Sequence, residues 1–157
     1  MADSSVSQPT PPPNEVYGIF AGPVDQGAVA RIGNAMAIAT SNNVTRIHLA
    51  FQTSGGMVAD GVALYNLFRA LHVPLTLYNI GSVSSAGVTA YLGAPSRLVS
   101  SHGTFMIHKT ISPALGFTSE RLQAMTQSVL IDDARMEAIF AASAGVVRSV
   151  RSITAAT

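Results

Sequence analysis

The sequence predicts an α/β fold in which a mainly parallel sheet is covered by helices. From residue 16 onward, short apolar runs alternate with longer stretches whose apolar residues recur every three or four positions. The first pattern is typical of buried strands and the second of amphipathic helices. Because strands alternate with helices and the loops between them are short, we expect a mainly parallel sheet with the helices packed on it. Hydrophobic residues make up 48% of the 157 residues, enough for one domain with a real core.

The first half of the chain contains two strand–helix units. A strand at 16–20 leads through a loop to Asp25, which can cap a helix. A second strand at 46–51 leads through "TSGG" (53–56) to a helix that Pro74 stops. The apolar stripes expected on these two helices are Val29, Ile32 and Met36, and Val58, Val62, Tyr65, Phe68 and Leu71.

The second half repeats this rhythm around a serine-rich motif. A strand at 75–80 runs into "GSVSS" (81–85), which a short apolar helix follows. Two further strands are expected at 97–100 and 104–108, and the longest helix at 118–144, capped by Thr118 or Ser119. Its expected apolar stripe is Leu122, Met125, Val129, Met136 and Phe140.

Composition excludes several classes of protein. The net charge of +1 provides no basic field for nucleic acid, and the lack of cysteine excludes disulfides and thiolate metal sites. No apolar run reaches the length of a membrane span and the start is not a secretory signal, so we expect a cytoplasmic protein. Charged residues are only 11%, which predicts subunit contacts. We expect a disordered Pro- and Ser-rich tail at 1–14, one domain at 15–145, and a separate tail at 146–157.

The two loops that follow predicted strands are the candidate functional site. In open α/β sheets, ligands bind beyond the carboxyl ends of the strands, where "TSGG" and "GSVSS" lie. Each loop precedes a helix and so offers free backbone N–H groups, the material of an oxyanion hole. A serine there needs a base, and His108, at the end of the 104–108 strand, is the best candidate. His48 suits a packed, hydrogen-bonded position, and His72 and His102 suit solvent. The local alternative is that Ser84 or Ser85 is only a helix cap.

The order of these pieces resembles the proteolytic subunit of the Clp protease (ClpP). The resemblance covers roughly 16–144 and is most specific at Gly55-Gly56, Ser85-Ala86-Gly87 and Met106-Ile107-His108. It implies the ClpP/crotonase-type fold, with the long helix as the family's handle. It also implies Ser85 as nucleophile, His108 as base, and the amides of Gly55 (or Gly56) and Ala86 as oxyanion donors. The implied activity is cleavage of unfolded polypeptides in a ring chamber fed by an ATP-dependent AAA+ unfoldase, without metal or cofactor.

The sequence departs from the family pattern in three places. Ser54 replaces a proline before the glycines, and the stretch between Ser85 and His108 is slightly short. The family's orienting Asp lies beyond the handle helix, whereas "VVRSVRSITAAT" (146–157) contains no carboxylate. We therefore expect an apparently truncated, divergent member whose given chain hydrolyses peptides very slowly or not at all.

Other charged residues are not expected to replace the missing Asp. Asp25 suits a cap, Asp60 a first helical turn, and Asp132 and Asp133 a solvated or interface pair. Lys109 should point away from the site if His108 points inward along a strand.

Two other functions fit parts of this pattern. An inactive ClpP-like ring subunit would explain the missing Asp, although Ser85 and His108 are retained. A crotonase-type acyl-CoA enzyme shares the fold and uses two backbone amides, but its chemistry needs no serine nucleophile.

Overall fold

A computed structural model describes residues 14–111 and 118–144, so the tail expected at 146–157 and all of the tail expected at 1–14 except Asn14 lie outside the described residues. Asn14 itself is held by the Thr45 amide, which donates to its carbonyl at 2.8 Å. The elements follow one another in the order β1-α1-β2-α2-β3-α3-β4-β5-α4. The strands are β1 (Glu15–Ala21), β2 (Arg46–Thr53), β3 (Leu75–Ser84), β4 (Ser96–Val99) and β5 (Thr104–Met106). The helices are α1 (Gln26–Ser41), α2 (Val58–Ala70), α3 (Ala86–Leu92) and α4 (Ser119–Ala144).

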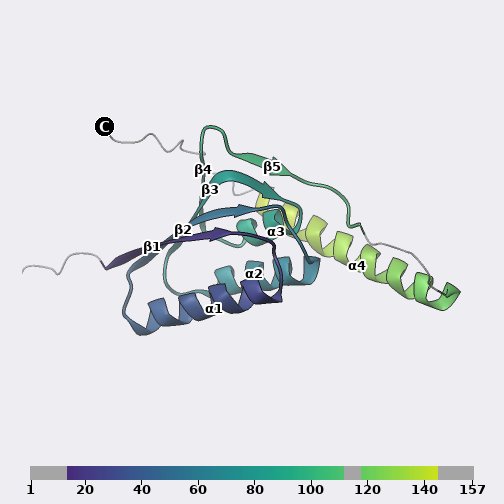
Figure 1. Cartoon of the computed structure of the whole chain (residues 1–157), viewed down its shortest axis with the longest axis horizontal. Coiled ribbons are helices and arrows are strands. Elements are labelled where there is room, and N and C mark those ends of the chain that lie inside the picture. The colour runs from purple at the N-terminus through teal and green to yellow at the C-terminus, as the bar shows by residue number, and fades with distance from the viewer. Residues whose placement is uncertain (1–13, 112–117, 145–157) are drawn as a thin grey trace, which may run out of the picture.

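All strand pairs are parallel, as the short βα units predict. The sheet order is β1-β2-β3-β4, and β5 also pairs with β3. The long strand β3 therefore holds β4 along its first half, from Thr76 to Asn79, and β5 along its last three residues. Figure 1 shows α1 and α2 side by side beneath the sheet, whereas α4 extends away from it.

The core lies between the sheet and helices α1, α2 and α3. Alternate residues of β2 and β3 point into it, and Phe51, Leu77 and Val83 are fully buried. They meet Ile32 and Met36 of α1 and Leu64 and Phe68 of α2. The opposite face of the sheet is open, and Tyr17 and Ile19 of β1 are exposed on it.

Local signals set most element boundaries. Asp25 caps α1 as predicted, accepting a hydrogen bond of 2.7 Å from the Ala28 amide. Helix α2 ends at Ala70, four residues before Pro74, and Asp60 lies in its first turn. Three strand ends differ from the prediction by two residues or more: β2 runs on to Thr53, β3 runs on to Ser84, and β5 ends at Met106, before His108.

Helix α4 is anchored at one end only. Met136 is buried against Val58 and Val62 of α2, and Phe140 packs there and against the main core. The N-terminal half projects from the body (Figure 1) and exposes Leu122, Leu130 and Ile131. The predicted apolar stripe is thus buried only toward the C-terminal end. None of the four helices that the structure describes combines the length and hydropathy of a membrane-spanning segment.

Candidate active site

Ser85 lies at the sharp junction between β3 and α3, in an unusual backbone conformation. Its φ of 54° and ψ of −130° place a non-glycine residue in a sparsely populated region. Within the described residues, only Asn43 shares a positive φ among non-glycine residues. Asparagine tolerates this conformation and serine much less, so the junction stores strain. A strained serine on a strand-to-helix turn is the arrangement of the nucleophile elbow.

The Ser85 hydroxyl does not serve the structural role that the local sequence favours. Ser85 occupies the N-cap position of α3, yet its side chain makes no capping hydrogen bond. Instead its amide donates to the carbonyl of Met106 at 2.7 Å, which joins the turn to β5. The side chain is thus left available for another role.

The glycine loop lies directly against Ser85. A Cβ added to Gly55 would stand 2.6 Å from the Cβ of Ser85 and 2.8 Å from the Ser84 carbonyl oxygen. A Cβ on Gly56 would stand only 2.1 Å from the carbonyl oxygen of Val24. Both positions require glycine for close approach. The two loops that sequence reasoning singled out are therefore neighbours in space.

The two glycine amides differ in what they can do. The Gly55 amide already donates to the buried Thr53 hydroxyl at 3.0 Å. The Gly56 amide, in contrast, donates to no acceptor within the described residues, and neither does that of Ala86 at the start of α3. Of the two glycines, only Gly56 thus has an N–H group free for an incoming oxygen.

Ser85 and His108 line one cavity of about 240 Å³, together with Gly56. Its far wall is α4, which contributes Met125, Ser128, Val129, Asp132 and Met136. No hydrogen bond joins Ser85 to His108 in this part of the chain. In enzymes without bound substrate, the hydrogen bond between nucleophile and base is often long or absent. The geometry is therefore compatible with Ser85 as nucleophile and His108 as general base.

The tautomer of His108 follows from its hydrogen bond. Its Nδ1 lies 2.6 Å from the carbonyl oxygen of Lys109. A carbonyl can only accept, so in the neutral ring Nδ1 carries the proton and Nε2 is free to take one. This is the tautomer that a general base needs when Nδ1 faces its orienting group.

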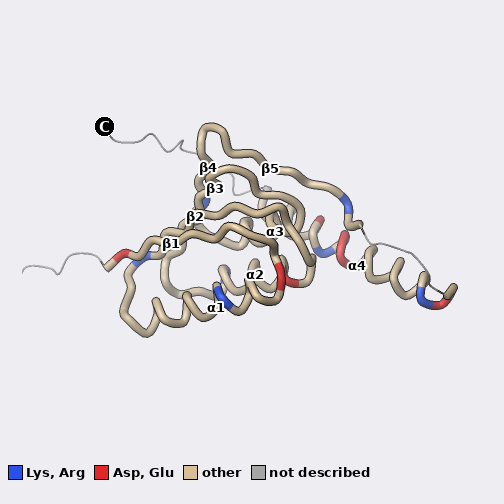
Figure 2. Tube along the Cα trace, in the orientation of Figure 1, with Lys and Arg blue, Asp and Glu red and all other residues tan. Residues whose placement is uncertain are grey.

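Helix α4 holds the segment that carries His108. Lys109 forms an ion pair with Glu137 and lies 3.8 Å from Asp133, and the Thr110 amide donates to Asp133 at 2.9 Å. The Thr110 hydrogen bond, with Lys109 adding to it, lowers the pKa of Asp133, and Glu137 raises the pKa of Lys109. Figure 2 shows few charged residues on the body and several where this segment passes α4.

These contacts correct the expectations for a solvated Asp133 and for a strand that ends at His108, and they agree with the expectation for Lys109. Asp133 is not solvated: its side chain is 17% exposed and bonded to the His108 segment. His108 does not end a strand, because β5 stops at Met106 and the residues after it bind to α4 through Lys109 and Thr110. Lys109 nevertheless stays off the Ser85 cavity, as expected.

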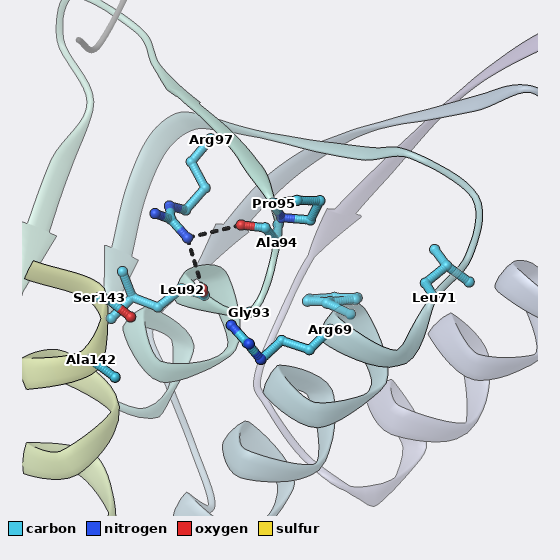
Figure 3. Close-up of a pocket in the computed structure, with 10 residues that line it drawn as sticks. Arg69, Leu71, Leu92, Gly93, Ala94, Pro95, Arg97, Ala142 and Ser143 are labelled. Atoms are coloured by element: carbon cyan, nitrogen blue, oxygen red, sulfur yellow. Dashed lines mark hydrogen bonds between the residues drawn. The ribbon is translucent and has the colours of Figure 1, made fainter. Parts of the chain in front are cut away.

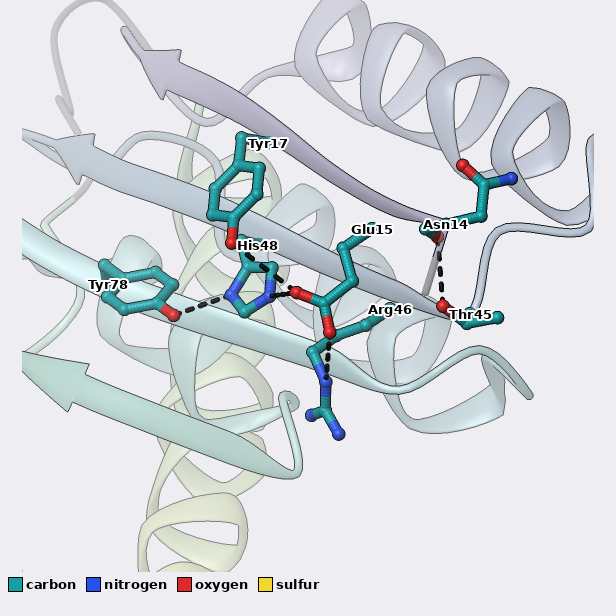
Figure 4. Close-up of polar contacts among 7 residues, drawn as sticks. All are labelled: Asn14, Glu15, Tyr17, Thr45, Arg46, His48 and Tyr78. Atoms are coloured by element: carbon teal, nitrogen blue, oxygen red, sulfur yellow. Dashed lines mark hydrogen bonds and ion pairs between the residues drawn. The ribbon is translucent and has the colours of Figure 1, made fainter. Parts of the chain in front are cut away.

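The other histidines lie elsewhere. His48 sits on the open face of the sheet, where it bonds Tyr78 at 2.6 Å and Glu15 at 3.1 Å and stacks on Tyr17 (Figure 4). Burial and the neighbouring Tyr17 raise the pKa of Tyr78. The prediction of a packed, hydrogen-bonded His48 is confirmed, and His72 and His102 are exposed as expected.

A second cavity, of about 280 Å³, is lined by Arg69 and Arg97 (Figure 3). Arg97 donates to the carbonyls of Leu92 and Ala94, both at 2.8 Å, and thereby closes the C-terminal end of α3. Arg69 lies in the last turn of α2 and stacks on Tyr65. Both arginines thus serve helix ends, and Ser85 is not among the residues lining this cavity.

Comparison with known proteins agrees with this architecture. The family model described as Clp protease matches residues 16–156, so the chain belongs to the Clp protease family. Among solved structures, it resembles the ClpP1 N165D mutant from Listeria monocytogenes, with a TM-score of 0.73 and 18% sequence identity. The match covers 82% of this chain and 72% of that one. The predicted ClpP-like fold is confirmed. The family match runs past residue 145, and the expected domain boundary there stays a prediction.

Proposed function

We propose that this chain is a serine peptidase subunit in which Ser85 is the nucleophile and His108 the general base. The observation that carries the proposal is the strained backbone of Ser85, whose hydroxyl caps nothing and lines a cavity with His108 and Gly56. Backbone strain persists where surrounding packing imposes it, and it clusters at functional sites.

In this mechanism Ser85 Oγ attacks the carbonyl carbon of a peptide while His108 Nε2 takes its proton. The amides of Gly56 and Ala86 donate hydrogen bonds to the resulting oxyanion. Gly55, the first candidate for this role, is not used because its amide already donates to the Thr53 hydroxyl. The imidazolium then protonates the leaving amine, and water hydrolyses the acyl-enzyme by the reverse route.

We further propose that the subunit works in a homo-oligomeric ring on unfolded polypeptides delivered by an ATP-dependent AAA+ unfoldase in the cytoplasm. Membership of the Clp protease family supports the ring, and the exposed apolar residues of α4 suit a contact between subunits. The family match also favours peptidase chemistry over the acyl-CoA alternative.

A fluorophosphonate probe tests the nucleophile, because it labels only an activated serine. We expect labelling of the wild-type chain, even where its peptide hydrolysis is very slow, and of Ser84→Ala, and none of Ser85→Ala. Ser84 is the matched control, since it is the adjacent buried serine and bonds Ser82. Labelling that survives Ser85→Ala would refute the assignment, and a folded chain that is never labelled would identify an inactive ring subunit.

A further inference from the structure

One carboxylate faces the proposed site from α4. Among the described residues that line the Ser85–His108 cavity, Asp132 is the sole acidic one. The α4 residues of that lining recur at helical spacing, so they form one face of the helix: Met125, Ser128, Val129, Asp132 and Met136. The orientation of Asp132 therefore follows from how α4 packs.

The neighbouring Asp133 cannot take the same role. It belongs to the adjacent face of α4, which lines a different cavity with Ile107, Lys109 and Glu137. Both of its oxygens are engaged, one by the Thr110 amide and the other by the Lys109 ammonium. His108 lines both cavities and thus lies between the two acidic faces.

Asp132 is held less firmly and keeps free capacity. Its side chain is 24% exposed, and one oxygen lies 3.4 Å from Arg135 Nη1, a long contact within the same helix. The other oxygen has no partner within residues 14–111 and 118–144. A largely shielded carboxylate facing a cavity acts on a nearby charge more strongly than a solvated one does.

Resting on the proposed function, we infer that Asp132 is the acidic positioning partner of His108. When His108 takes the proton of Ser85, its ring becomes a positively charged imidazolium. The negative charge of the Asp132 carboxylate across the cavity then stabilises this imidazolium, and with it the transition state. The Lys109 carbonyl meanwhile fixes the tautomer. In triad enzymes one buried Asp does both. Here the two tasks are divided between a backbone carbonyl and a carboxylate of α4.

The test measures the second-order rate of fluorophosphonate labelling of the full chain at neutral pH. We expect Asp132→Asn to slow labelling by about a hundredfold, the lower end of the range for acid–base contributions. Asp132→Glu should recover part of the loss. Glu120→Gln removes the same charge from the first turn of α4, outside the cavity lining, and should change the rate less than twofold.

A double-mutant comparison separates an effect through His108 from a structural one. Asp132→Asn should have no further effect once His108→Ala is present, because the imidazolium it stabilises is gone. The inference about Asp132 is overturned, without affecting the proposed function, if Asp132→Asn leaves the labelling rate unchanged. It is also overturned if Asp132→Asn slows labelling by the same factor in the wild type and in His108→Ala. Absence of Ser85 labelling in the wild type overturns the proposed function as well.

Discussion

Replacing Ser85 by glycine should stabilise the fold relative to alanine, the reverse of the usual order. Both substitutions remove the hydroxyl, so their comparison isolates the backbone. A non-glycine residue at φ 54° and ψ −130° carries strain, and such strain costs about 1–3 kcal/mol per residue. Glycine adopts this conformation readily but adds about 0.4–1 kcal/mol of unfolded-state entropy. The difference leaves Ser85→Gly more stable than Ser85→Ala by roughly 0.5–2 kcal/mol.

Thermal unfolding at one fixed protein concentration measures this difference, because association shifts apparent stability. For a chain of this size, each 1 kcal/mol corresponds to about 2–4 °C in Tm. The matched control is Ser84, one residue earlier in β3 and without a positive φ. There the glycine variant should be the less stable one, by about 0.5–1 kcal/mol.

A Ser85→Gly variant that melts below Ser85→Ala, by the same margin as at Ser84, would show that the junction is not strained. The main structural argument for Ser85 as nucleophile would then be lost. Neither Ser85 variant should hydrolyse peptides, so the gain in stability comes only with loss of function.

Three further predictions concern packing, charge and assembly. In a urea titration, Gly87→Ala should destabilise the chain by about 1–3 kcal/mol, because its Cβ would stand 2.2 Å from Thr53 Cγ2. In the same titration Gly33→Ala, whose Cβ would stand 3.9 Å from Leu67, should stabilise the chain through α1 by up to about 1 kcal/mol. The pKa of Asp133 is lower in the folded chain than its ordinary value of 3.8. Its carboxylate therefore adds to the free energy of unfolding above pH 3.8, and this stabilisation is lost as the pH falls from 3.8 through the pKa of the folded state. The stability gap between wild type and Asp133→Asn should therefore shrink below pH 3.8, and a constant gap would contradict this. Leu130→Ser with Ile131→Ser, two positions 57% and 56% exposed, should give smaller species in sedimentation without lowering the Tm of the protomer, and an unchanged sedimentation coefficient would argue against α4 as a contact.

Most of the fold could be predicted from the sequence because each βα unit carries its own boundary residues and apolar periodicity. Asp25 and Pro74 mark helix ends through their own chemistry, and the apolar periods of α1 and α2 need no tertiary information. The end of β3 was missed for a different reason. Its last residues look like a polar turn, and they are a strand because β5 pairs with Ser82, Val83 and Ser84 and Thr53 of β2 pairs with Val83. A non-local pairing of this kind leaves no mark in "GSVSS" itself.

The candidate site was predictable in its glycines, its serine and its histidine, but not in its carboxylates. Asp132 and Asp133 are adjacent, and sequence alone does not say which side of α4 meets the body. The helix carries apolar residues on more than one side, since Leu130 and Ile131 are exposed whereas Met136 is buried, and only its C-terminal half is packed. Docking turns Asp133 toward Thr110 and Asp132 toward the cavity. The choice between Gly55 and Gly56 likewise depends on Thr53, which the sequence does not single out.

The small residues around Ser85 have a common physical cause. Gly55 meets Ser85 itself, Gly61 of α2 would place a Cβ 2.5 Å from the carbonyl oxygen of Ala86, and Gly87 lies against Thr53. Two other segments, residues 53–56 and α2, thus approach the β3–α3 junction more closely than larger side chains at these glycines would allow. On another side, the Met106 carbonyl holds the Ser85 amide. A strained conformation persists only when its surroundings leave no alternative, and these contacts do so here. The glycines of the two motifs therefore hold Ser85 in its strained conformation, and Gly56 can also supply an amide to the substrate.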